Sequence, residues 1–329
     1  MAATIIDVAN LCGYSKATVS RAYASPETVS EKAREKVYAA AKKLNYRPNA
    51  IARAMVRQRT ENIAFVIHEK QYPVILNPFY SLALEAAIQE GTKRNYSLFI
   101  TTSQDMQLPN GDIYIKKQMD GVIFAGEANQ RAIEEFRGQN IPVVLLNNQM
   151  ENLLCVTADH FQGAVAAMEH LYGCGHRKIG LLAGRFSRQV SEARFSGYCK
   201  VLCDHGLSLN THFVRDIDPT LEAGEEAMAA LLKLPDHPTA VFCTNDTIAA
   251  GAVKAIVRAG LRVPEDVAVV GFDDSYISRV IEPELTTVRI DADRMGRIAT
   301  QKLFDLIDGQ NVENETIQIP TQLIVRGTT

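Results

Sequence analysis

Four residues near the N-terminus have the types and the spacing that suit contact with DNA. Lys16, Ala17, Ser20 and Arg21 fall on one face of a helix, because residues one turn apart lie side by side. Lys and Arg donate to phosphates and to guanine, Ser bonds to several base edges, and a small methyl group touches thymine. These residues therefore predict a face that reads bases and binds phosphates.

The elements that must hold this face are two short helices joined by a tight turn. Thr4, with Asp7 three residues later, forms a capping-box pattern that opens the first helix. Gly13 supplies the turn, and Ser15 is a favourable N-cap for a second helix that begins at Lys16. This is the layout of a helix-turn-helix, whose second helix enters a DNA groove.

Apolar residues on the opposite faces predict a small core, which a third helix capped by Ser30 completes. The inward residues that the spacing predicts are Val8, Ala9 and Cys12, then Val19, Ala22 and Tyr23, and then Ala33, Val37, Ala40 and Leu44. An ordinary bundle of three amphipathic helices is the alternative interpretation, because short helices with a glycine turn are common.

The distribution of charge favours the DNA-binding interpretation. Residues 1–60 carry 11 Lys and Arg against 4 Asp and Glu, whereas the remaining residues carry 24 against 34. The net charge of −3 for the whole chain therefore conceals a basic head on an acidic body. Such asymmetry is typical of a nucleic-acid-binding segment attached to another domain, and its affinity should fall as salt rises.

The residues after position 60 predict an α/β architecture. Apolar, strand-like runs alternate with helical stretches such as residues 80–95, which is typical of doubly wound parallel sheets. The runs cover residues 63–67, 97–101, 121–125, 143–147, 178–183, 239–244 and 267–272. The whole chain suggests roughly ten strands, too many for one compact sheet, so we expect two similar lobes.

Polar and aromatic residues follow several of these predicted strands. In parallel sheets, ligands bind beyond the carboxyl ends of the strands, so a site for a small polar or polyhydroxylated ligand is predicted there. The candidates are Phe79, Asn147, Arg194, Asn245 and Asp273. Taken singly, the Asn and Asp residues could equally be turn formers or helix caps.

Composition and motifs disfavour other classes of protein. No apolar run has the length of a membrane helix, and no basic-then-apolar leader precedes the first helix, so we expect a cytoplasmic, nucleoid-associated protein. The six cysteines include no Cys-x-x-Cys pair, and the seven histidines lack metal-ligand spacing. No phosphate loop, dinucleotide fingerprint or nucleophile elbow is present, so neither an enzyme, nor a cofactor, nor a metal site is expected.

Short motifs recur in a fixed order along essentially the whole chain. They lie at residues 7–9, 13–21, 29–30, 34–37, 44–49 and 52–53 in the head, and at 77–80, 119–123, 175–180, 245–246, 263–274 and 283–288 in the body. In this combination the chain resembles the LacI/GalR family of bacterial transcription regulators. The resemblance implies an all-α helix-turn-helix head on an α/β core like that of periplasmic sugar-binding proteins.

The same resemblance implies the domain boundaries. We expect a DNA-binding domain at residues 1–46, a hinge helix or linker at 47–60, and a core at 61–329 for effector binding and dimerisation. Within the core, lobe 1 is expected at about 61–159 and 290–317, and lobe 2 at about 160–289 and 318–329.

The resemblance also assigns roles to residues. Lys16, Ala17 and Arg21 fall on the positions that read major-groove bases, and Met55 falls on that of an apolar wedge that kinks the operator in the minor groove. The full DNA-binding set is Thr4, Ser15, Lys16, Ala17, Thr18, Ser20, Arg21, Asn49, Ala52, Arg53 and Met55. In the core, Phe79, Asn147, Arg194, Asn245 and Asp273 are the implied effector-binding residues.

The implied partners are operator DNA, a second copy of the chain, and a small effector such as a sugar or sugar derivative. The predicted function is a repressor of a carbohydrate-utilisation operon on a pseudo-palindromic operator. Alternatives with the same fold are a regulator that answers to a nucleobase or to a phosphorylated protein co-repressor, and a sugar-binding transport protein. Effector and DNA binding would be coupled reciprocally through lobe closure and the hinge.

Overall fold

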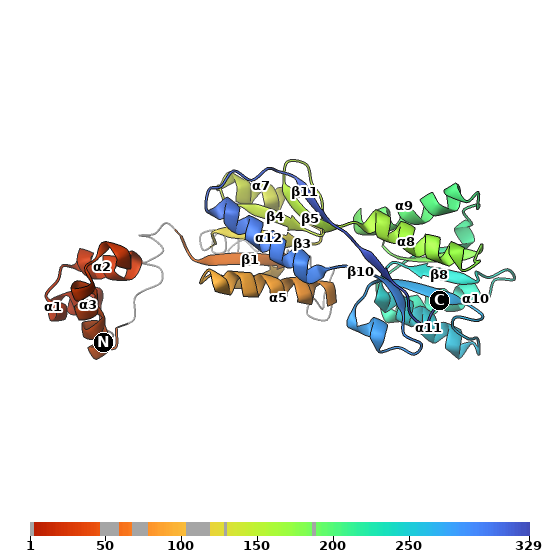
Figure 1. Cartoon of the computed structure of the whole chain (residues 1–329), viewed down its shortest axis with the longest axis horizontal. Coiled ribbons are helices and arrows are strands. Elements are labelled where there is room, and N and C mark those ends of the chain that lie inside the picture. Colours follow the sequence, from red (N-terminus) through yellow and green to blue (C-terminus); the bar gives the residue numbers. More distant parts are fainter. Residues whose placement is uncertain (1–2, 47–58, 68–77, 103–118, 128–129, 186–188) are drawn as a thin grey trace.

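The computed structural model of the protein describes residues 3–46, 59–67, 78–102, 119–127, 130–185 and 189–329 (Figure 1). Most of the predicted hinge, including Asn49, Ala52, Arg53 and Met55, lies outside these residues, so their roles stay predictions. No helix within the described ranges is long and apolar enough to span a membrane.

The head consists of three α-helices, as the sequence predicts. They are α1 (Ile5–Cys12), α2 (Lys16–Ala24) and α3 (Glu31–Lys43), with a short 3-10 turn η1 (Pro26–Thr28) before α3. Gly13 ends α1 in the left-handed conformation, at φ 74°, which glycine adopts without steric cost. Ser30 occupies the N-cap position of α3, but its side chain makes no capping hydrogen bond, contrary to the prediction.

The core of the head is formed by the predicted inward faces. Val8, Val19, Ala22 and Val37 are each 0% exposed, and Leu44 is partly buried against them. Such spacing buries one stripe of each helix and leaves the opposite faces in water.

Two six-stranded sheets form the two lobes of the core, and the predicted fold class is therefore confirmed. Lobe 1 has the strand order β11-β5-β4-β3-β1-β2, and all its pairs are parallel. Its strands are β1 (Asn62–Ile67), β2 (Ser97–Thr102), β3 (Gly121–Ala125), β4 (Val143–Leu146), β5 (Leu154–Ala158) and β11 (Thr316–Ile319). Helices α5 (Pro78–Lys93), α7 (Gln130–Gly138) and α12 (Ala292–Ile307) pack against this sheet.

Lobe 2 has the strand order β12-β10-β9-β8-β6-β7. Its strands are β6 (Ile179–Gly184), β7 (Val214–Ile217), β8 (Ala240–Cys243), β9 (Ala268–Asp273), β10 (Thr286–Arg289) and β12 (Gln322–Ile324). Helices α8 (His160–Gly173), α9 (Gln189–Asp204), α10 (Leu221–Leu232) and α11 (Asp246–Arg258) pack against it, and the 3-10 turns η5 (Thr211–Phe213) and η6 (Tyr276–Arg279) lie in its loops.

The chain passes three times between the lobes (Figure 1). It crosses from β5 to α8, from β10 to α12, and from β11 to β12. The boundary expected between residues 317 and 318 falls inside β11, because β11 pairs with β5 as far as Ile319. Strand β12 pairs antiparallel to β10, unlike the parallel sheet expected, since β10 leaves lobe 2 where β12 enters it.

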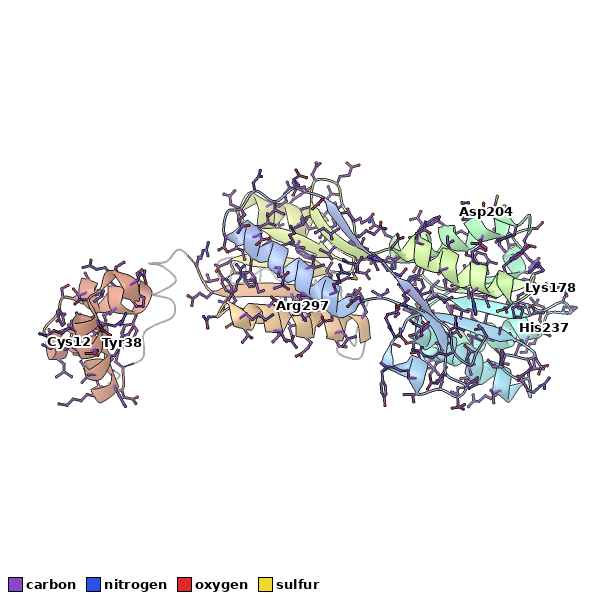
Figure 2. All side chains as sticks on the ribbon, in the orientation of Figure 1. Cys12, Tyr38, Lys178, Asp204, His237 and Arg297 are labelled. Atoms are coloured by element: carbon purple, nitrogen blue, oxygen red, sulfur yellow. The ribbon has the colours of Figure 1, made fainter. Side chains whose placement is uncertain are left out.

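Helices α5 and α12 approach each other so closely that only glycine fits at one point. A Cβ added to Gly296 on α12 would lie 2.3 Å from the carbonyl oxygen of Ala83 on α5. Beside this contact, Arg297 (labelled in Figure 2) donates to Glu90 of α5 at 2.7 Å. The pair of helices therefore forms one rigid layer on lobe 1.

Replacing Gly296 with alanine should lower the free energy of unfolding by about 1–3 kcal/mol, the usual cost of overpacking. Urea unfolding of the full chain measures this loss. Gly138→Ala, at the last residue of α7, is the control, because an added Cβ there meets no described atom within 4 Å. An equal loss in both variants would contradict the close approach.

Candidate functional site

The outer face of α2 carries the predicted base-reading residues. Lys16, Ala17 and Arg21 are exposed, and Ser20 is half-buried beside them. The Arg21 Nε donates to the carbonyl oxygen of Ala17 at 3.4 Å, which orients the guanidinium along the helix surface. The structure therefore brings these predicted DNA-binding side chains together on one exposed helix face.

Of the other three predicted residues of the head, Thr4 and Ser15 are N-caps, and Thr18 is the partner of the Ser15 cap. Thr4 and Asp7 close the capping box of α1, with the Thr4 amide donating to Asp7 Oδ2 at 2.8 Å. Ser15 Oγ accepts from the Thr18 amide at 3.1 Å and lies 2.9 Å from the Thr18 hydroxyl. These contacts fix the N-terminus of α2, which satisfies backbone donors that would otherwise be unpaired.

Tyr38 and Tyr46, which the sequence analysis did not single out, pack against the predicted core residue Tyr23 and hold α2 against α3. Tyr38 (labelled in Figure 2) donates from its hydroxyl to the carbonyl oxygen of Ala22 at 2.8 Å, and its ring centroid lies 5.2 Å from that of Tyr23. Tyr46 packs edge-on against Tyr23 at 6.3 Å. The only feature of the sequence that indicates this cluster is that Tyr38 and Tyr46 stand close to the apolar residues of α3.

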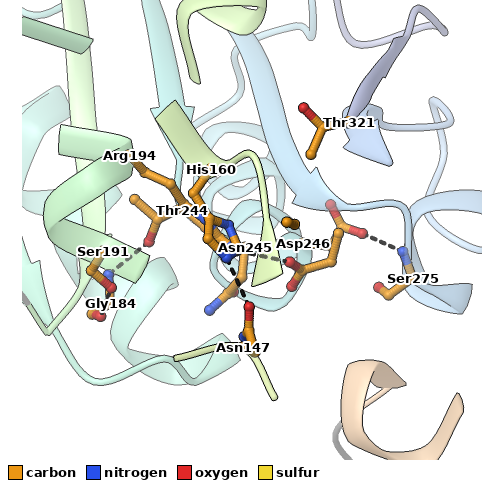
Figure 3. Close-up of polar contacts among 12 residues, drawn as sticks. Asn147, His160, Gly184, Ser191, Arg194, Thr244, Asn245, Asp246, Ser275 and Thr321 are labelled. Carbon is orange, nitrogen blue, oxygen red and sulfur yellow. Dashed lines mark hydrogen bonds and ion pairs between the residues drawn. The ribbon is translucent and has the colours of Figure 1, made fainter. Parts of the chain in front are cut away.

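The second candidate site lies where the two lobes join, and Arg194 is its centre (Figure 3). The side chain is buried, with the residue only 6% exposed. Its Nη2 donates to Asp273 Oδ1 at 3.3 Å, and its Nη1 donates to the carbonyl oxygen of Thr244. Its guanidinium carbon lies 3.8 Å from the ring centroid of Phe272. The guanidinium is thus held by an anion, a carbonyl and an aromatic face at once.

A histidine that the sequence analysis did not propose as a site residue completes this cluster. His160 is the first residue of α8 and is 4% exposed. Its Nε2 lies 2.8 Å from Asn147 Oδ1 in lobe 1, and its Nδ1 accepts from Arg194 Nε at 3.3 Å. No metal-ligand or catalytic spacing marked this residue, because its partners lie 13 and 34 positions away.

Two carboxyl groups form the acidic side of the cluster. Asp246 accepts from the Ser275 amide at 2.6 Å and from the Thr287 hydroxyl at 2.5 Å. Burial raises the pKa of Asp246, and the nearby charge of Asp273 raises it further. Burial also raises the pKa of Asp273, while Arg194 opposes that rise. Asp246, Asp273 and Arg194 therefore share a site in which an unpaired charge is energetically costly.

The backbone of the cluster adopts uncommon conformations. Asn147 has φ 58° and Asp273 has φ 111°, values that non-glycine residues rarely take. Residues held in this way cluster at ligand-binding and catalytic sites, where the surrounding structure enforces them.

The structure places the remaining two candidates differently. Asn245 caps α11, with its Oδ1 accepting from the Ile248 amide at 2.7 Å, so the cap interpretation holds for that oxygen. Phe79 is buried at the start of α5, edge-on to Tyr80 with a centroid distance of 5.0 Å. Burial lowers the pKa of Arg194, whereas the charges of Asp273 and Asp246 oppose that shift.

Comparison with known proteins agrees with both halves of the chain. Residues 4–49 match the model "Bacterial regulatory proteins, lacI family", and residues 168–329 match a periplasmic binding protein-like domain. The HTH-type transcriptional repressor PurR of Actinobacillus pleuropneumoniae serotype 3 (strain JL03) is 33% identical over 333 residues, covering 98% of this chain and 97% of that protein. The chain belongs to the LacI family.

Solved structures of LacI-family proteins share the whole fold. The lac repressor dimer bound to operator and the anti-inducer ONPF is 27% identical, with a TM-score of 0.86 over 100% of this chain and 99% of that one. The transcriptional regulator CelR–cellobiose complex is 29% identical, with a TM-score of 0.76 over 99% of this chain and 100% of that one. As a LacI-family member, the chain is a DNA-binding transcriptional regulator with a ligand-binding core.

Proposed function

We propose that this LacI-family chain is a homodimeric repressor that recognises a pseudo-palindromic operator through α2. A small carbohydrate effector would control its affinity for that operator. The observation that carries the proposal is the exposed face of Lys16, Ala17 and Arg21 on α2, whose N-terminus Ser15 caps. Two copies would place this face in successive major grooves, about one helical turn apart. The protein acts by binding, without catalysis, on DNA in the cytoplasm.

The chemistry of the buried cluster supports a polyhydroxylated effector. Arg194 offers a planar set of donors, and Asp273 offers acceptors, so together they can bind neighbouring hydroxyl groups in a fixed orientation. The guanidinium of Arg194 lies over the ring of Phe272, which holds its donors in a fixed plane. A member of the same family with the same fold is solved with cellobiose.

An apolar face on lobe 1 supports the dimer. Strand β2 is an edge strand of its sheet, and it exposes two large apolar side chains: Phe99 is 45% exposed and Ile100 is 55% exposed. Leu82 and Ile88 of α5, the helix that packs on β2, are 52% and 39% exposed. An exposed apolar edge strand invites pairing or aggregation, so we infer that a second copy covers this face.

Replacing Ile100 with aspartate should convert the dimer to monomers at micromolar concentration, because the symmetric interface would bury two unpaired carboxylates. Sedimentation velocity on the full chain measures the change, and operator affinity should fall with it. Val257→Asp on α11 is the matched control, since Val257 is also 55% exposed. Monomerisation by both variants, or by neither, would contradict this interface.

Helix α12 offers a route from the effector site to the hinge. The Ile290 amide, just before α12, donates to the carbonyl oxygen of Asp273 at 3.4 Å. Beyond the other end, about 24 Å away for a helix of this length, Asp308 binds Arg59 at 2.7 Å and Arg94 at 2.8 Å. Arg59 is the first described residue of the predicted hinge at 47–60 and lies near its C-terminal end. We infer that movement of Asp273 reaches the DNA-binding head through this helix.

The proposal is tested in two steps on the full chain. DNA fragments selected from a genomic library should share two inverted half-sites, and footprinting should show protection of both. A thermal-shift panel of cellobiose, D-ribose, adenine and adenosine then identifies the effector class, since a ligand at 100 times its Kd stabilises by about 2.7 kcal/mol.

Each outcome of the panel favours one candidate. A shift with a sugar supports the carbohydrate regulator, and a shift with adenine or adenosine alone supports the nucleobase alternative. No shift with any compound, together with operator binding that needs a phosphorylated protein, supports the co-repressor alternative. Sugar binding without any selected DNA sequence would leave a transport protein instead.

A further inference from the structure

The buried imidazole of His160 joins three parts of the fold that are remote in sequence. It stands at the first crossing between the lobes, where β5 ends and α8 begins. Its Nε2 lies 2.8 Å from Asn147 Oδ1, and its Nδ1 lies 3.3 Å from Arg194 Nε and 3.2 Å from Arg194 Nη2 (Figure 3). Asn147 follows β4 of lobe 1, while Arg194 lies on α9 of lobe 2.

The hydrogen-bond chemistry of these partners fixes the tautomer of the ring. Arginine has donors only, so His160 Nδ1 must act as the acceptor toward Arg194. The proton of a neutral imidazole is therefore on Nε2, where it is donated to Asn147 Oδ1. The geometry thus orders the contacts as a directed chain from Arg194 through His160 to Asn147.

The surroundings keep this ring uncharged. Burial lowers the pKa of His160 well below its ordinary value, and the positive charge of Arg194 lowers it further. The other ring beside it, Phe272, is uncharged, with a centroid distance of 6.0 Å. The carboxylate of Asp273 is engaged by Arg194 at 3.3 Å. A proton on Nδ1 would remove the acceptor that Arg194 uses and place two cations in contact.

We propose that His160 is a positioning residue that couples Arg194 in lobe 2 to Asn147 in lobe 1 through its neutral Nε2–H tautomer. When an effector accepts hydrogen bonds from Arg194, the bond between Arg194 and His160 changes. That change is transmitted to Asn147 in lobe 1 through the His160 ring as well as through the backbone. The proposal rests on the effector site described above, but its test uses neither effector nor DNA, so the two can fail separately.

The first test is a set of variants that asks whether His160 carries the coupling. In the full chain, Arg194→Met and Asn147→Ala should each lower the urea midpoint, and the double variant should lose less than the sum of the two shifts. In a His160→Phe background, which keeps an aromatic ring without nitrogen atoms, the two shifts should add. Non-additivity of the same size in both backgrounds would overturn the proposal.

The second test reads the protonation state of the ring directly and does not rely on comparing unfolding free energies. In the ¹⁵N spectrum of histidine-labelled full chain, the signal absent from H160F should show a neutral Nε2–H ring that stays neutral as pH is lowered through the ordinary pKa of histidine. Asn147→Ala should shift its Nε2 resonance most. An Nδ1–H tautomer, or titration with the ordinary pKa near 6.5, would overturn the proposal.

The same ring should leave a signature in the pH dependence of stability. The pKa of His160 is lowered in the folded state, so between about pH 6.5 and that lower value the unfolded chain binds one proton more. Stability should therefore fall as pH falls below 6.5, by up to tenfold in the folding equilibrium constant per pH unit from this group. H160F should lack that share of the slope, and an unchanged slope would count against a neutral buried ring.

Discussion

Replacing Arg21 with alanine is expected to weaken operator binding by about 2–6 kcal/mol, or roughly 30-fold to 10⁴-fold, because each half-site loses one base contact worth about 1–3 kcal/mol. Arg21 is exposed on α2, so the head should keep its fold. Fluorescence anisotropy with the selected operator, at fixed salt, measures the loss.

A matched control separates this contact from general loss of positive charge. Arg131→Ala removes an arginine from α7 of lobe 1, where the side chain is 87% exposed, and should leave operator affinity unchanged. Arg21→Ala should also relax the preference for the base pair it contacts, whereas loss of a phosphate contact weakens all sequences alike. A uniform loss across sequences would show that Arg21 binds phosphate and does not read a base.

Replacing Arg194 with methionine is expected to abolish the effector response. It should also lower the free energy of unfolding by about 3–5 kcal/mol, the usual cost of removing one partner of a buried ion pair and leaving the other unpaired. The variant removes the cation that faces Asp273 at 3.3 Å and leaves the Thr244 carbonyl oxygen without this donor. Urea unfolding measures the stability, and operator titration with the compound found in the panel measures the response.

The pH dependence of this variant has a definite sign. Without Arg194, the pKa of the partly buried Asp273 rises further above its value in the unfolded chain, near 3.9. A raised folded-state pKa stabilises below the unfolded value, and that share is lost as pH rises through the folded value. The deficit of the variant against the wild type should therefore be smallest near pH 4 and grow toward neutral pH.

A double variant provides the control. Arg194→Met with Asp273→Asn replaces the unpaired carboxyl by a neutral amide, so part of the stability should return and the pH-dependent deficit should disappear. The effector response should stay lost, since both proposed effector contacts are absent. A single variant with wild-type stability and response would show that the Arg194–Asp273 pair supports neither the fold nor the site.

The sequence alone predicted the head in detail because its signals are local. The capping box of Thr4 and Asp7, the turn at Gly13 and the cap at Ser15 lie within a few residues of the helices that they define. The burial of Val19 and Ala22 follows from the period of the same helix. The exposed face with Lys16 and Arg21 follows in turn, because what remains on a helix must face water.

The sequence predicted the α/β fold class of the core, but not how its strands are connected. The apolar runs that became β1, β2, β3, β4, β6, β8 and β9 were visible because strands of parallel sheets are rich in consecutive apolar residues. Strands β5, β7, β10, β11 and β12 were not predicted, and β11 and β12 are short edge strands with exposed positions. Their direction depends on where the chain crosses between lobes, which no local pattern encodes.

Part of the candidate ligand site was likewise predictable from the sequence, and part was not. The sequence by itself determined which residue types end the strands, and so nominated Asn147, Arg194 and Asp273. Only the tertiary structure decided that His160 stands between Asn147 and Arg194, and that Asn245 uses its oxygen as a helix cap. The physical reason is that caps and faces are set by neighbours within one helical turn, whereas contacts between residues 13 to 79 positions apart exist only once sheet order and lobe crossings have brought them together.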